Sequence, residues 1–124
     1  MRPPRPHLAL AAVAGIAVVS AAAVPAAAGG GKPQKKTVEI GDNYYSPTKL
    51  TVNKGSTITW KWPDTTGDTH DVTLQKGPKG VKKFASEQAG SFYSYKRKLT
   101  VAGEYKIICT LHEQEMKMTI RVRR

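Results

Sequence analysis

The segment EYKIICTLHEQEMKMTIRV, residues 104–122, gathers side chains that can bind a soft metal ion. It contains Cys109, the only cysteine of the 124-residue chain, and Met116 and Met118, two of its three methionines. His112 follows the cysteine at a CxxH spacing. Thiolate, imidazole and thioether groups are all good ligands for transition metals. The segment therefore raises the question of whether its lone thiol is a metal ligand.

The N-terminal residues 1–28 have the layout of a secretory signal peptide. Arginines precede an apolar run at residues 8–19, and small residues ending at Ala28 offer an AxA cleavage site. We predict cleavage after Ala28 and export of the chain, without stable membrane insertion afterwards. An uncleaved anchor is the alternative, because further alanines extend the apolar run.

Residues 29–36, GGGKPQKK, are predicted to form a flexible basic leader, followed by one domain over residues 37–124. Loss of Arg2 and Arg5 with the signal lowers the basic residues from 20 to 18 against 9 acids, and the net charge from +11 to +9. The exported domain therefore stays strongly basic. Because its basic residues are scattered over an exported chain, nucleic-acid binding is not expected.

Export limits what a single thiol can be. In an oxidising compartment an unpaired cysteine is an intermolecular bridge, a reactive thiol or a metal ligand. Cys109 has no partner within the chain. The nearby His112 and Met116 favour the interpretation of Cys109 as a metal ligand. This interpretation also needs a β-scaffold that positions these side chains and a further histidine that completes the site.

Apolar and polar residues alternate in short runs, which is the period of β-strands. Turn-forming segments rich in Gly, Pro, Asn and Asp separate these runs. Seven or eight short strands are expected, as an antiparallel Greek-key sandwich or barrel, with helix limited to a turn around residues 86–89. The runs are TVEI, LTV, STITWKW, HDVTL, EYKIIC and MTIRV.

Alternation also predicts where two candidate ligands point. His70 is separated from Val72 and Leu74 by an even number of positions, which we call the same parity. Cys109 has the same parity as Tyr105. Residues two apart lie on the same face of a strand. Both candidate ligands are therefore expected to point inward at strand ends.

Residues 37–122 resemble the cupredoxins, the group of small blue copper proteins that includes plastocyanin, amicyanin and pseudoazurin, here of an exported bacterial type. The first half shows YYSPTKLTVNKGSTITWKWPDTTGDTHDV, with an aromatic-x-Pro segment, LxVxxGxxIxW and a later histidine. The second half shows GxYxxxC, CxxH, a nearby methionine and a last strand. The resemblance implies an eight-stranded sandwich and one copper ion that cycles between Cu(I) and Cu(II).

The resemblance also implies the ligands. His70, Cys109 and His112 correspond to the equatorial ligands, and Met116 to the weak axial ligand. Soft sulfur stabilises Cu(I) while imidazole stabilises Cu(II). Met118 competes for the axial position, because it replaces the usual glycine of the family, but its strand parity favours packing in the core.

Asp71 stands where several members of the family carry asparagine. In those proteins the asparagine ties the two ligand loops together. The aspartate could do part of this, because residues behind metal ligands fix ligand orientation. Because Asp71 is on the outward side of the strand pattern, a solvated carboxylate is the equal alternative.

Two functions follow from the resemblance. The first is an electron carrier that passes one electron between redox proteins and catalyses nothing alone, and the second is copper delivery or sequestration. A complete set of one cysteine and two histidines favours the carrier, and multicopper oxidases need histidines that the chain lacks. We expect a monomer with the lysine-rich segments 76–83 and 96–98. Lysines around His112 are expected to steer an acidic redox partner, or an anionic envelope surface, to dock close to this residue.

Overall fold

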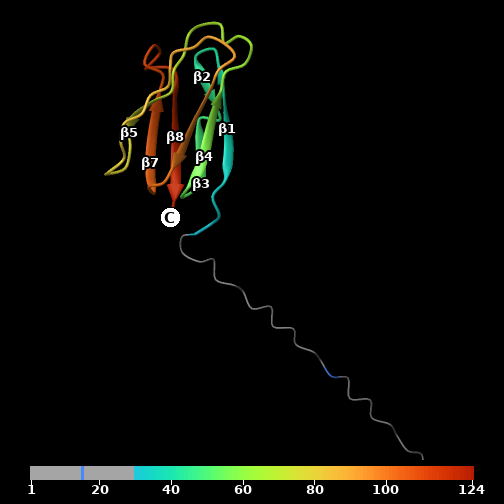
Figure 1. The fold of residues 1–124 in the computed structure, drawn as a ribbon, viewed down its shortest axis with the longest axis vertical. Coiled ribbons are helices and arrows are strands. Elements are labelled where there is room, and N and C mark those ends of the chain that lie inside the picture. Colours follow the sequence, from blue (N-terminus) through green and yellow to red (C-terminus); the bar gives the residue numbers. More distant parts are fainter. Residues whose placement is uncertain (1–14, 16–29) are drawn as a thin grey trace, which may run out of the picture.

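The computed structural model describes residue 15 and residues 30–124 (Figure 1). Apart from Gly15, the predicted signal peptide lies outside the described residues. The described residues contain eight strands and no helix, so none of them forms a helix that could span a membrane. The strands are β1 (Lys35–Gly41), β2 (Tyr44–Ser46), β3 (Lys49–Asn53), β4 (Ser56–Lys61), β5 (Thr73–Lys76), β6 (Ser94–Leu99), β7 (Gly103–Ile108) and β8 (Lys117–Arg123).

The strands form two four-stranded sheets that pack face to face (Figure 1). One sheet has the order β2-β1-β4-β6 and the other has the order β3-β8-β7-β5. The predicted all-β sandwich is thus confirmed. A purely antiparallel arrangement was the wrong prediction, because β1 pairs with β4 and β3 pairs with β8 in parallel. The chain crosses to the other sheet between β2 and β4, so β1 and β4 run in the same direction.

The core lies between the two sheets and follows the predicted alternation. In β4, Ile58 and Trp60 are fully buried, and the inward residues of the other sheet are buried opposite them. The Trp60 indole donates a hydrogen bond to the Met118 sulfur, at 3.3 Å across the sandwich. Burial of large apolar side chains supplies the main driving force for folding. The buried residues of β7 and β8 are Tyr105, Ile107, Ile108, Met118, Ile120 and Val122.

The segment before the predicted domain boundary at residue 37 is hydrogen-bonded to the sandwich. β1 already begins at Lys35, and the Gln34 amide donates to Ser56 Oγ at 2.8 Å. The Gly30 amide donates to the Arg124 carbonyl at 2.6 Å. The structure thus places residues 34–36 in or against the first sheet, and the chain enters the domain beside its C-terminus.

The segment around residues 86–89 forms no helical turn. Ala85 and Ala89 instead form isolated bridges, Ala85 with Thr73 and Ala89 with His70. The prediction of a turn there was wrong, because the chain runs back along β5 in an extended path. This return segment closes the sandwich beside His70.

One end of the sandwich carries the connections that matter for the site. β1, β4 and β7 finish there, and β2, β3, β5, β6 and β8 begin there. The loops that join these strands meet at the end opposite to the C-terminus (Figure 1).

Candidate metal centre

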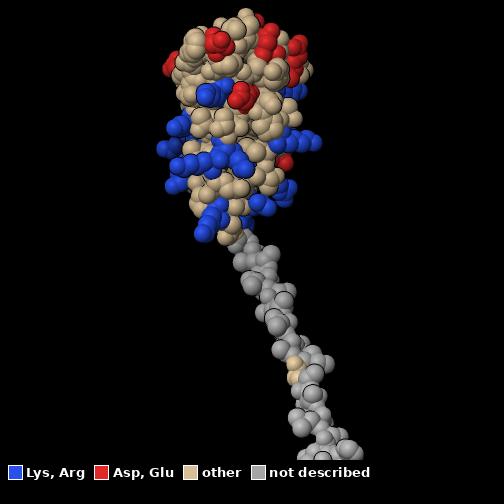
Figure 2. Space-filling model, turned by 90° about the vertical axis from the view of Figure 1, so that its right-hand side faces the viewer, with Lys and Arg blue, Asp and Glu red and all other residues tan. Residues whose placement is uncertain are grey.

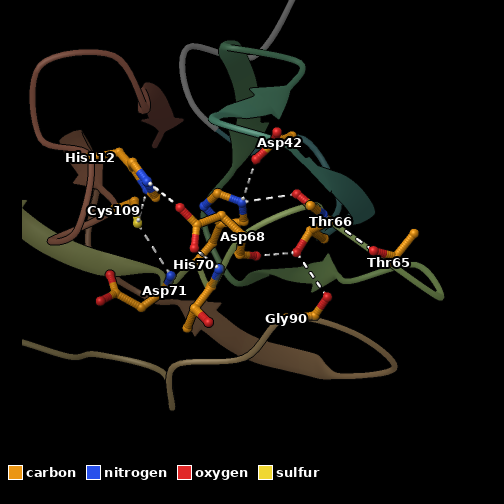
Figure 3. A network of polar contacts seen from close by, with 11 residues as sticks. Asp42, Thr65, Thr66, Asp68, His70, Asp71, Gly90, Cys109 and His112 are labelled. Atoms are coloured by element: carbon orange, nitrogen blue, oxygen red, sulfur yellow. Dashed lines mark hydrogen bonds and ion pairs between the residues drawn. The ribbon is translucent and has the colours of Figure 1, made fainter.

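Three potential metal ligands converge at this end of the sandwich (Figure 3). His70 lies in the loop before β5, and Cys109 and His112 lie in the loop between β7 and β8. Their ligand atoms lie within 4.8 Å of one another. Cys109 and His70 are fully buried, and the side chain of His112 is 19% exposed. The structure thus brings the three predicted equatorial residues together.

Backbone hydrogen bonds fix the loop that carries Cys109 and His112. The Cys109 amide donates to the Met116 carbonyl at 3.0 Å, which closes the loop at its base. The His112 amide donates to the Cys109 carbonyl at 3.2 Å, and the Met116 amide donates to the His112 carbonyl at 2.9 Å. These hydrogen bonds restrain the positions of the cysteine and the histidine.

His70 is held by both its backbone and its ring. Its amide and carbonyl form a pair of hydrogen bonds with Ala89, at 2.9 and 3.0 Å. Its Nε2 lies 3.2 Å from the Thr66 carbonyl, which can only accept, so Nε2 carries the proton. In a neutral imidazole the other nitrogen is then a free acceptor. Nδ1 is buried and has no hydrogen-bond partner among the described residues, as expected of a metal ligand.

The ring of His112 is oriented in the same way. Its Nε2 lies 3.2 Å from Asp68 Oδ2, and its Nδ1 lies 3.6 Å from the Cys109 sulfur. The Nε2–H group donates a hydrogen bond to the carboxylate, which leaves Nδ1 to face the cysteine and His70 (Figure 3). The Thr69 amide, and then the His112 ring, lower the pKa of Asp68. The Asp68 carboxylate is therefore ionised at neutral pH.

Asp71 ties the two ligand loops together and is buried. Its Oδ1 accepts hydrogen bonds from the Thr110 amide and from Thr73 Oγ1, both at 3.0 Å, and its Oδ2 accepts one from Thr110 Oγ1. Its own amide points at the Cys109 sulfur from 3.4 Å. Of the two alternatives for Asp71, the structure shows the one that ties the loops together and not the solvated carboxylate, because β5 begins only at Thr73 and its alternation does not extend back to residue 71.

Tyr45 supports Asp71 from the other sheet. Its buried hydroxyl donates to the Asp71 carbonyl at 2.7 Å. Burial, followed by the nearby Cys109 and Asp71, raises the pKa of this phenol above its ordinary value. The sequence suggested only a core residue at this position, because nothing in the pattern shows which loop a tyrosine in the other sheet reaches.

The two methionines have different surroundings. Met116 is fully buried at the end of the ligand loop. Met118 lies in β8, where its sulfur accepts the hydrogen bond from the Trp60 indole. Met118 therefore packs in the core, as its parity predicted, and its sulfur faces the opposite sheet.

The charges of the domain are unevenly distributed (Figure 2). Carboxylates gather over the loops at the end with the cluster, and most lysines and arginines cover the middle and the other end. The prediction that lysines surround His112 was wrong. The lysine-rich segments 76–83 and 96–98 lie along β6 and on the loop that leaves β5 at its far end, so their sequence positions did not reveal their distance from the site.

Comparison with known proteins assigns this arrangement to a family. The sequence profile of copper binding proteins of the plastocyanin/azurin family matches residues 33–123. No curated protein sequence matches the chain. Among solved structures, a reduced Cu(I) form of an amicyanin variant superposes with a TM-score of 0.62, at 26% identity, over 72% of this chain and 82% of the amicyanin.

Two further structures share the fold. A pseudoazurin from Sinorhizobium gives a TM-score of 0.58 at 20% identity, over 73% of this chain and 75% of the pseudoazurin chain. A copper-containing nitrite reductase from Thermus scotoductus SA-01 gives a TM-score of 0.61 at 29% identity. The match covers 75% of this chain but only 23% of the nitrite reductase chain. With a profile match across the sandwich and two histidines and a cysteine converging at one end, the chain belongs to the plastocyanin/azurin family of copper-binding proteins, and copper is its cofactor.

Proposed function

We propose that the protein is a one-electron carrier with a single type 1 copper site and no substrate turnover of its own. His70, Cys109 and His112 would hold the ion, and Met116 would be the additional, weak ligand. The observation that carries the proposal is the convergence of two imidazole Nδ1 atoms and one thiol sulfur in a buried cluster. This donor set suits copper in both oxidation states, and the bound copper supplies the redox change between Cu(I) and Cu(II).

The residues around the cluster suit electron transfer. Hydrogen bonds within the loop, the contacts of Asp71, and the contacts of Thr66 and Asp68 with the two rings restrain the ligands. A fixed geometry needs little rearrangement when the oxidation state changes. The partly exposed ring of His112 supplies a short path to the surface, whereas the other ligands are sealed from water.

Voltammetry of the copper-loaded protein tests the function. We expect one reversible one-electron wave and copper that stays bound through many oxidation and reduction cycles. Copper that exchanges rapidly with a chelator, without a stable oxidised form, would contradict the carrier and favour copper delivery or sequestration.

We also propose that the chain is exported as a monomer after removal of residues 1–28. The support is the signal-like sequence and the buried free thiol, because metal ligation protects a cysteine from pairing in an oxidising compartment. The mature protein is expected to begin at Gly29, which an intact mass of exported material checks. A mass that includes residues 8–19 would show that the segment is retained.

Replacement of the two methionines separates the axial ligand from the core residue. Met116→Leu is expected to raise the reduction potential and change the visible spectrum, because a thioether ligand is lost at nearly constant volume. Met118→Leu removes only the acceptor of the Trp60 hydrogen bond and should lower stability by about 1 kcal/mol. Spectra and voltammetry of both variants decide, and a larger spectral change in Met118→Leu would refute the assignment.

Asp71→Asn is expected to raise the reduction potential by roughly 60 mV, about a tenfold change in a one-electron equilibrium. The buried carboxylate lies beside the Cys109 loop, and its negative charge favours Cu(II) over Cu(I). Glu104→Gln removes one charge at the start of β7 and is the control, with a much smaller shift. Equal shifts in the two variants would show that the location of the carboxylate is unimportant.

A further inference from the structure

We propose that the redox partner of this protein docks over His112 with a basic rim, although the protein itself is strongly basic. The proposal rests on the proposed electron-carrier function and adds the chemistry of the partner. It reverses the acidic partner expected from the net charge. The end of the sandwich that carries His70, Cys109 and His112 is called the copper end. Two independent features of the copper end support the proposal, its exposed carboxylates and its exposed apolar side chains.

Carboxylates dominate the loops at the copper end (Figure 2). Asp68 lies 3.2 Å from the ring of His112, and Asp42 lies 3.5 Å from the ring of His70. Only two of the nine acidic residues, Glu39 and Glu104, lie in strands. Asp71 is buried in the site, and the six others are exposed in loops: Asp42, Asp64, Asp68, Glu87, Glu113 and Glu115.

The only three large hydrophobic side chains that are exposed among the described residues lie in segments at this end. Leu111 precedes His112 in the ligand loop and is 47% exposed. Phe92, which is 82% exposed, is linked to the loop after β4 by a hydrogen bond from its amide to the Pro63 carbonyl. Tyr44 begins β2, beside the turn that carries Asp42. Exposed apolar groups rimmed by charge are typical of protein interaction sites.

The local charge, rather than the net charge, governs docking at physiological salt. Residues 30–124 carry 18 basic and 9 acidic residues, a net charge of +9. A seven-residue strand such as β8 spans roughly 23 Å, whereas the Debye length at 0.15 M salt is about 8 Å. The basic end is thus screened from a partner at His112. Only Lys49, Lys61 and Lys117 lie at strand ends that face the copper end.

Small redox reagents of opposite charge measure the sign of the field at the electron exit. The reduced protein is mixed with tris(phenanthroline)cobalt(III), a cation, or hexacyanoferrate(III), an anion, in a stopped-flow salt series. Each encounter moves one electron, so Cu(I) becomes Cu(II) while cobalt(III) becomes cobalt(II) or iron(III) becomes iron(II). The rate with the cation is expected to fall by about tenfold as salt rises from about 0.01 to 0.15 M.

Variants at the two ends of the domain locate the effect. Glu113→Gln with Glu115→Gln should lower the low-salt rate with the cation by at least about threefold. Glu104→Gln removes a carboxylate from the far end of β7, opposite Arg121 of β8, and should leave that rate within experimental error. A lysine-rich c-type cytochrome is expected to follow the pattern of the cation.

Two results overturn the proposal in different ways. A rate with the cation that rises with salt, or the same loss of rate per removed charge at Glu104 as at Glu113 and Glu115, would show that the net charge governs the encounter, while electron transfer itself remains intact. A copper-loaded protein that transfers no electron to either reagent would overturn the proposed function, and the docking proposal with it.

Discussion

Cys109→Ser is expected to abolish the intense visible absorption of the copper-loaded protein. Coordination deprotonates a thiol, and the thiolate is the donor for the charge-transfer band. A serine hydroxyl keeps its proton at neutral pH and binds copper weakly. Copper affinity should fall by more than about 100-fold, the upper range for losing a residue that only supports a ligand.

The substitution should leave the fold intact, which makes its spectrum interpretable. Serine fits the buried site of Cys109, and the backbone hydrogen bond to Met116 does not depend on the side chain. Visible absorption and competitive copper titration measure the effect, with circular dichroism as the control for folding. An intense band that survives in the serine variant would disprove thiolate ligation.

Trp60→Ala is expected to destabilise the metal-free domain by about 3–5 kcal/mol. The indole is fully buried between the sheets, contacts the ring of Tyr95 and donates to the Met118 sulfur. Truncation leaves a cavity that rigid strands cannot close. Because small domains are stable by only about 5–15 kcal/mol, the variant could lose most of its stability.

Urea unfolding of the metal-free protein measures this loss. Phe92→Ala is the control, because the Phe92 ring is 82% exposed, and its effect should stay within about 0.5 kcal/mol. A Trp60→Ala variant as stable as the control would mean that the indole does not hold the two sheets together.

Alternation in the sequence reveals the strands that have a buried apolar face, but it does not reveal β2 and β6. Alternation in β4, β7 and β8 is clear because apolar residues occupy every inward position. In β6 an inward position holds Arg97, whose guanidinium lies 4.6 Å from the centre of the Phe84 ring and hides the alternation. β2 has only three residues, too few to show a period of two.

The site residues were predictable where they lie close together in the sequence or at the end of a predicted strand. Cys109 and His112 are close in sequence, and His70 follows from parity and the family pattern. The sequence left two alternatives open for Asp71, because its partner Thr110 lies 39 residues away and only the packing of two loops brings them together. The charge layout was hidden for the same reason, since only the topology shows which loops share an end.

The pairing of Gly30 with Arg124 brings both ends of the domain to the side away from the copper. A tag or fusion partner attached after Arg124 therefore leaves the face around His112 unobstructed. Immobilised on an electrode through a C-terminal tether, the protein would present its electron exit to solution rather than to the metal surface. Because both ends of the domain lie opposite to His112, the domain is also suited to fusion as the terminal module of an engineered redox enzyme.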